Sequence, residues 1–230
     1  MQLSQDFINQ YHEAPDPAKY AKSVARAGRL FNILWNLRII NAEKVPLSGA
    51  TIMAFQHRSY RDPWIYGTST PRAIMGMGKA ELLNWYYLGF GSSYLTNRGF
   101  TFVTRDGDVS REEMEYSYEV LRKRKALAVA PEGTSENRGR KIGKTKQGIG
   151  RLVAKMTAEG IETVVVPVAV ASDTWKIGDS IPIVFGDLIT APTEVTTIRQ
   201  RKQSAKDTNE ELVIRLQELS DISYDLRETA

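Results

Sequence analysis

The stretch from Gln56 to Asp62 holds the side chains best suited to chemistry. From His57 it reads H-x-S-x-x-D, directly after an apolar run at residues 50–55. His57 is one of only two histidines in the chain. A carboxylate that accepts the proton of histidine Nδ1 holds the ring in one tautomer and leaves Nε2 free to take a proton from a hydroxyl group. The pair is therefore a candidate general base with its orienting partner, although a histidine near an aspartate is also common in purely structural settings.

Three further loops follow predicted strands and carry unusual side chains. Arg105 ends the strand predicted over residues 99–104, where its planar guanidinium could bind two phosphate oxygens or pair with a nearby aspartate. Glu132, followed by Gly133, could hold a substrate hydroxyl or pin a basic residue, or simply form a turn. Residues 138–155 contain seven Lys and Arg, four interleaved Gly and no acid. Such a loop could cradle an anion or be a solvated surface loop.

The composition of the chain limits the chemistry further. The absence of cysteine excludes disulfides, thiolate metal sites and a cysteine nucleophile, and two histidines cannot form a His-rich metal site. The net charge of +4 suits an anionic partner. The basic loop lacks the G-x-x-x-x-G-K-[ST] pattern of an NTPase and the interleaved aromatic side chains of a nucleic-acid surface. We therefore expect neither a metal nor a nucleic-acid partner.

Alternating strand and helix patterns must position these loops. The 230 residues, 42% of them hydrophobic, suit one α/β domain with a mixed, largely parallel sheet covered by helices. In such sheets the active loops gather at strand ends. The predicted strands span 51–55, 72–77, 99–104, 126–130, 163–171 and 181–185. The predicted helices span 3–13, 18–36, 79–89, 110–125 and 147–159, with a last helix capped at 208–211.

The expected organisation is an N-terminal helical element over residues 1–45 and the α/β domain over 46–230. Within the first, residues 18–36 combine an apolar stripe with four Lys and Arg, Arg38 follows, and no acid occurs between Ala18 and Ala42. A basic amphipathic helix of this kind could lie in a membrane interface or pack on the domain with its cations in water. No apolar run reaches the ~18 residues of a membrane span, and the first residues lack signal-peptide features. We expect the protein on the cytosolic side.

Taken in order, these blocks resemble the lysophosphatidate acyltransferases, within the wider glycerolipid acyltransferases that carry the H-x(4)-D box. The resemblance covers about residues 50–190. The similar blocks are His57 to Asp62, the K-x-E-L at 79–82, the G-x-x-x-x-x-R from Gly99 to Arg105, the P-E-G-T at 131–134, the V-P-V at 166–168 and the F-G-x-x-I at 185–189.

This resemblance implies transfer of an acyl chain from acyl-CoA or acyl carrier protein to a hydroxyl of lysophosphatidate or a related lysoglycerolipid, giving a phosphatidate-type product without a cofactor. Asp62 would orient His57, whose Nε2 would remove the proton from the attacking hydroxyl. Arg105, Glu132 and Gly133 would bind the glycerol phosphate of the acceptor. Related activities on the same fold are acyl-chain remodelling with another headgroup and lipid binding without turnover.

The chain departs from the family pattern at some of these blocks. Gln56 stands before the box histidine, where Asn is common. Ser135 replaces the Arg usual after P-E-G-T, so Arg138 or Arg140 could supply the phosphate contact instead. The other positions that the resemblance places near the substrate are Ser59, Lys79 and Thr134, with Ser59 as a loop-shaping hydroxyl.

The resemblance also bears on the N-terminal element, because family members often carry two N-terminal helices on the bilayer face. The predicted helices at 3–13 and 18–36 look like such a pair. With amphiphilic substrates, this favours monotopic or peripheral attachment through residues 18–36 to the cytoplasmic side of a membrane.

Overall fold

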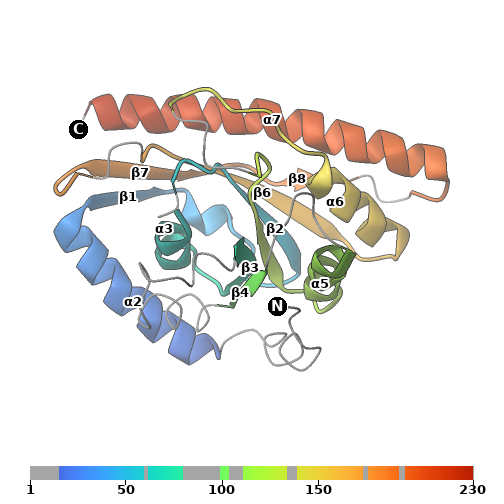
Figure 1. Ribbon diagram of the computed structural model, residues 1–230, viewed down its shortest axis with the longest axis horizontal. Coiled ribbons are helices and arrows are strands. Elements are labelled where there is room, and N and C mark those ends of the chain that lie inside the picture. The colour runs from blue at the N-terminus through green and yellow to red at the C-terminus, as the bar shows by residue number, and fades with distance from the viewer. Residues whose placement is uncertain are drawn as a thin grey trace.

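The computed structural model describes residues 16–59, 62–79, 99–103, 111–133, 139–172, 176–191 and 195–229. Within these ranges the chain forms one mixed sheet with helices on both faces (Figure 1). The strands are β1 (Asn36–Ile40), β2 (Ala50–Phe55), β3 (Ile74–Lys79), β4 (Phe100–Val103), β5 (Ala126–Val129), β6 (Thr163–Val170), β7 (Ser180–Phe185) and β8 (Ile189–Thr190). The helices are α2 (Pro17–Leu34), η1 (Ala42–Lys44), α3 (Asp62–Ser69), α5 (Arg111–Arg122), α6 (Gly148–Ala158) and α7 (Ile198–Glu228).

The strand order is β1-β7-β6-β2-β5-β3-β4, with β8 beside β6. β6 pairs antiparallel with β7 and β8, and the other pairings are parallel. This confirms the mixed, largely parallel sheet expected from the sequence. β2 lies between β5 and β6, and all six of its residues are buried. Its unbroken apolar sequence is explained by this position, because a central parallel strand has helices over both faces.

Alternation along β2 supplies both layers of the core. Met53 and Phe55 pack in a cluster with Ile65 and Tyr66 of α3. Ile52 and Ala54, which point to the opposite face, join a second cluster built with α5, α6 and α7. Because both faces of β2 are buried, the end of this strand, and with it Gln56 and His57, is held at the centre of the molecule.

The first helix packs on the domain through its apolar stripe. Asp16 caps α2, since its side chain accepts the backbone N–H of Lys19, and Pro17 occupies the first turn. Tyr20 and Ala27 are buried, and the Tyr20 hydroxyl donates to the Thr70 carbonyl. α2 contacts α3 and β1. The predicted N-terminal partner helix, residues 3–13, lies outside the described residues.

The structure differs from the sequence prediction at both ends of the chain. Residues 36–40, assigned to the N-terminal element, form β1 and pair in parallel with β7, so the sheet reaches across the expected boundary at residue 45. β1 is an edge strand with a mixed burial pattern, which apolar periodicity does not separate from the end of a helix. The last helix begins at Ile198 and not at 208–211, with Thr197 and Gln200 forming a capping box.

The early part of α7 was missed because the residues it buries are small or polar. Ser204, Ala205, Thr208 and Asn209 are buried there, and apolar periodicity appears only from Leu212 onward. α3 and β8 were also not predicted, since each is short. Of the helix predicted over 79–89, Lys79 ends β3 and the rest lies outside the described residues. No helix in the part of the chain that the structure describes is long and apolar enough to cross a membrane.

Candidate active site

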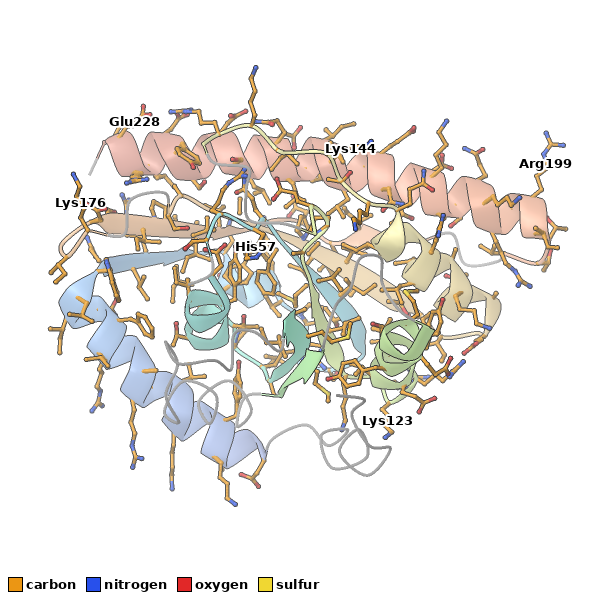
Figure 2. All side chains as sticks on the ribbon, in the orientation of Figure 1. His57, Lys123, Lys144, Lys176, Arg199 and Glu228 are labelled. Atoms are coloured by element: carbon orange, nitrogen blue, oxygen red, sulfur yellow. The ribbon has the colours of Figure 1, made fainter. Side chains whose placement is uncertain are left out.

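The structure brings His57 and Asp62 into direct contact. His57 follows the end of β2, and Asp62 is the first residue of α3. The Nδ1 atom of His57 lies 2.9 Å from Oδ2 of Asp62. The Asp62 side chain is 1% exposed, whereas the His57 side chain is 26% exposed and lies near the middle of the molecule in Figure 2. The buried carboxylate thus faces one ring nitrogen, and the ring retains exposed surface.

The spacing of the H-x(4)-D box follows from how the loop wraps around the Asp62 carboxylate. Oδ2 also accepts the backbone N–H groups of Arg58 at 2.6 Å and Ser59 at 2.7 Å. Oδ1 accepts the hydroxyl of Ser172 at 3.2 Å. Three donors on one oxygen fix the carboxylate and favour the tautomer in which His57 Nδ1 carries the proton. Nε2 is then the nitrogen that can accept a proton.

Glu132 holds the loop that carries His57 (the histidine loop). Its carboxylate accepts the backbone N–H of His57 at 3.0 Å and of Gly143 at 2.7 Å. It also pairs with the guanidinium of Arg58 at 3.3 Å, and both side chains are 0% exposed. The contact of Glu132 with the acceptor stays a prediction. Of the uses predicted for it, pinning a basic residue is the one observed.

Arg58 is the buried cation that the sequence reasoning did not single out. Its backbone N–H bonds Asp62, its guanidinium pairs with Glu132, and it also donates to the carbonyl of Lys141 at 3.2 Å. It thereby ties the histidine loop to the loop after β5 and to the basic loop. The sequence offers one signal for this pair. Arg58 lies inside the H-x(4)-D block, and Glu132 lies inside the P-E-G-T block.

Gly133 has a left-handed backbone, with φ of +69°. A Cβ placed there would lie 3.3 Å from Cε of Lys146, whose backbone N–H donates to the Pro131 carbonyl at 2.8 Å. The lysine stem therefore passes directly over this glycine. A side chain at position 133 would be strained by its backbone conformation and would meet Lys146.

The remaining predicted site residues divide into three groups. Ser59 lies in the loop and contributes its N–H to Asp62, and Lys79 is the last residue of β3. Arg140 points to α7, where it pairs with Asp225 at 2.5 Å and Glu228 at 2.9 Å. The guanidinium thus bonds the end of α7, and its expected contact with a phosphate stays a prediction. Three predicted residues lie outside the described part of the chain: Arg105, Thr134 and Arg138.

Tyr66 of α3 contacts the two residues that precede His57. Its ring stacks on Phe55 with centroids 3.8 Å apart, and its hydroxyl donates to the carbonyl of Gln56. Burial, reinforced by the nearby Asp62 carboxylate, raises the pKa of the Tyr66 phenol well above its ordinary value. Tyr66 is therefore a neutral hydrogen-bond donor.

Two comparisons with known proteins found a match. The model of the Acyltransferase family matches residues 36–171, more than half of the chain. The fold is similar to the crystal structure of the 1-acyl-sn-glycerophosphate (LPA) acyltransferase PlsC from Thermotoga maritima, with a TM-score of 0.59 and 16% sequence identity over 84% of this chain and 78% of that one. Comparison with curated proteins gives no match. The matched region contains the His57–Asp62 contact and the Glu132 network, and the chain belongs to the acyltransferase family.

Proposed function

We propose that this protein is an O-acyltransferase that moves a fatty acyl chain from a thioester, acyl-CoA or acyl carrier protein, to a hydroxyl of lysophosphatidate or a related lysoglycerolipid. The single observation that carries the proposal is the contact between His57 Nδ1 and the buried Asp62 carboxylate. The family membership supports the acyl-transfer chemistry, and the similarity to a 1-acyl-sn-glycerophosphate acyltransferase supports the glycerolipid acceptor.

The chemistry needs one well-oriented base. Nε2 of His57 takes the proton of the acceptor hydroxyl as its oxygen attacks the thioester carbonyl carbon. Asp62 stabilises the imidazolium that forms, as a buried carboxylate on Nδ1 does in catalytic triads. The C–S bond then breaks, the acyl chain is left as an ester of the acceptor, and the proton passes from His57 to the departing thiolate. Base catalysis of this kind contributes roughly 10²–10⁴-fold.

No covalent acyl-enzyme is required, which suits a chain without cysteine. The two substrates react directly with each other, so both must reach Nε2 at the same time. His57 keeps 26% of its side chain exposed, in contrast to the enclosed Asp62. The acceptor can therefore approach the ring without moving the carboxylate that orients it.

The outer face of α2 supports an additional proposal, that the protein docks on an anionic membrane surface. Because Tyr20 and Ala27 face the domain, the apolar stripe is largely used internally. What α2 presents outward is a set of cations with Leu30 and Ile33, which are 56% and 77% exposed. The exposed cations are Lys19, Lys22, Arg26 and Arg29. A basic face with two apolar side chains suits the surface from which a lysolipid would be drawn.

Thiol release tests the proposed function. Purified protein is given acyl-CoA or acyl carrier protein together with a panel of lysophospholipids, and wild type is compared with His57→Ala. We expect acceptor-dependent release from wild type and a loss of at least 10²-fold in His57→Ala. Wild-type turnover by His57→Ala would overturn the mechanism. A folded wild type that binds vesicles but releases no thiol with any acceptor would favour lipid binding without catalysis.

A further inference from the structure

Gln56, the residue before His57, is held at every polar group it has. Its backbone N–H donates to the Val168 carbonyl at 2.9 Å, and its own carbonyl accepts the Tyr66 hydroxyl. Its side-chain Oε1 accepts the backbone N–H of Val170 at 3.3 Å, and its Nε2 donates to Oγ of Ser220 at 2.9 Å. Gln56 is fully buried. The residue that leads into the base is thus bonded to β6, to α3 and to α7.

The contact with Ser220 is one step in a hydrogen-bond chain whose direction is determined. Because Val170 N–H requires an acceptor, the Gln56 amide must present its oxygen to β6 and its NH₂ group to α7. The Ser220 hydroxyl accepts from that NH₂ group and donates to the Arg140 carbonyl at 2.7 Å. Ser220 is fully buried. Its hydroxyl links Gln56, which follows β2, to Arg140 of the basic loop.

Gln217, one turn earlier on α7, fixes the basic loop a second time. Its Oε1 accepts the backbone N–H of Ile142 at 3.0 Å, and its Nε2 donates to the Arg140 carbonyl at 3.2 Å. The next residue of that loop, Gly143, donates to Glu132, whose carboxylate also holds the backbone of His57. α7 therefore contacts both segments that enclose the histidine loop, from Gln56 on one side and from residues 140–143 on the other.

We propose that Ser220 and Gln56 are positioning residues for His57, so that α7 sets the placement of the base. The helix lies after residues 36–171, the region that the family model matches. This inference rests on the proposed function, in which His57 is the base. A general base acts over a donor–acceptor distance of ~2.6–3.2 Å, and a misplacement of about 1 Å can cost ~10²-fold in rate. Loss of the Ser220 hydroxyl frees the Gln56 amide to rotate and takes away one of the supports of the basic loop.

The experiment compares Ser220→Ala with Ser223→Ala. Both serines are fully buried on α7, but among the residues that the structure describes the Ser223 hydroxyl donates to the Ser220 carbonyl of its own helix. The two substitutions therefore remove the same atom from the same helix, and only one of them touches the hydrogen-bond chain. For each variant we would measure kcat and KM, urea unfolding, and the imidazole NMR signals. The chain has two histidines, and His12→Gln assigns the His57 signals.

We expect Ser220→Ala to shift the His57 ring signals, including the Nδ1 proton bonded to Asp62, and to lower kcat roughly tenfold with little change in KM. Ser223→Ala should leave the His57 signals and kcat near wild type at a comparable loss of stability. Gln56→Met, which keeps the side-chain length and removes both amide contacts, should reproduce the shift. It also serves as the second variant if Ser220→Ala does not fold.

Unchanged His57 signals and kcat in folded Ser220→Ala or Gln56→Met would overturn the inference, because the chain would then serve stability alone. Equal effects of Ser220→Ala and Ser223→Ala on the ring signals would overturn it as well. The NMR readout does not depend on the acceptor. Absence of transfer by wild type would therefore count against the proposed function, while the ring signals would still decide whether α7 positions His57.

Discussion

Asp62 determines both the orientation and the charge partner of His57. Its Oδ2 holds the ring nitrogen and two backbone N–H groups, so that one atom organises the loop and the base together. An amide oxygen in the place of Oδ2 can accept these hydrogens, but it carries no negative charge with which to stabilise an imidazolium. We therefore expect a variant that lacks the Asp62 carboxylate to have a lower kcat even if it folds.

For Asp62→Asn we expect a loss of kcat on the order of 10⁴-fold, the magnitude of the equivalent change in a catalytic triad. KM for the acceptor should change little, because the side chain is enclosed. Ser172→Ala is the control, since it removes the 3.2 Å contact to Oδ1 and leaves the carboxylate in place. Steady-state kinetics on both variants, with circular dichroism to confirm folding, measures the difference. A kcat for Asp62→Asn equal to that of Ser172→Ala would contradict the orienting role.

We expect substitution of Glu132 to lower the free energy of unfolding and to have a smaller effect on acceptor binding. Glu132→Gln removes the carboxylate charge that faces the guanidinium of Arg58 in a site where both side chains are 0% exposed. Breaking a buried pair typically costs about 3–5 kcal/mol of unfolding free energy. Glu210→Gln is the matched control, because its pair with Lys206 is exposed and should contribute about 0–1 kcal/mol.

Urea unfolding of Glu132→Gln and Glu210→Gln checks this expectation. If Glu132 instead bound the acceptor directly, its amide variant would unfold like wild type and show a raised KM. That result would support the contact expected from the P-E-G-T block and would contradict the enclosed network seen around His57 and Gly143.

At the scale of elements, α6 and α7 approach each other too closely at one point for any side chain. The backbone N–H of Gly150 donates to the Asn209 side chain at 3.1 Å. A Cβ on Gly150 would lie 2.0 Å from the Ala205 carbonyl oxygen and 2.4 Å from the Asn209 amide nitrogen. Because the first of these is backbone, one of the two helices would have to move.

Gly150→Ala should therefore lower the free energy of unfolding by about 1–3 kcal/mol, as overpacking does. Gly148→Ala on the same helix is the control, because nothing lies within 4 Å of the Cβ it would add. It should be neutral or slightly stabilising, since alanine is the better helix former. Thermal or urea unfolding of the pair decides the matter, and equal stabilities would mean that the helices separate without cost.

At the scale of the whole molecule, the two long helices lie on opposite sides of the sheet (Figure 1). α7 packs along β6 and β7, whereas α2 packs on α3 and β1. The proposed division is that α7 supports the histidine loop from one side and α2 presents its basic outer face to lipid on the other. The two roles can be tested separately, the α7 role through the buried Ser220 and the α2 role through exposed residues of its outer face.

The double substitution Leu30→Ser with Ile33→Ser should reduce binding to anionic vesicles by roughly tenfold or more, because insertion of an apolar side chain contributes on the order of 1 kcal/mol or more. The control is Ile214→Ser, which changes an isoleucine that is 60% exposed on α7. Co-sedimentation with vesicles measures both. Equal binding by the two variants would remove α2 as the docking helix.

Part of the fold was predictable because a buried strand appears in the sequence as a run of apolar residues. β2, β5, β6 and β7 are buried apolar runs between turn residues, so their sequences alone located them. β1 is a partly exposed edge strand, and the start of α7 buries small polar residues against α6. Such elements gain their stability from partners distant in the chain, and periodicity therefore does not reveal them.

The sequence by itself determined the candidate base and its partner, because five residues and a helix start are enough to bring His57 and Asp62 together. It also determined the class of sheet and, through the order of its motifs, the family. Only the tertiary structure decided which polar side chains are buried together near the site. Glu132 and Arg58 are 74 residues apart, and Gln56 and Ser220 are 164 apart. Contacts of that separation depend on how strands and helices stack, and no local pattern of residues encodes them.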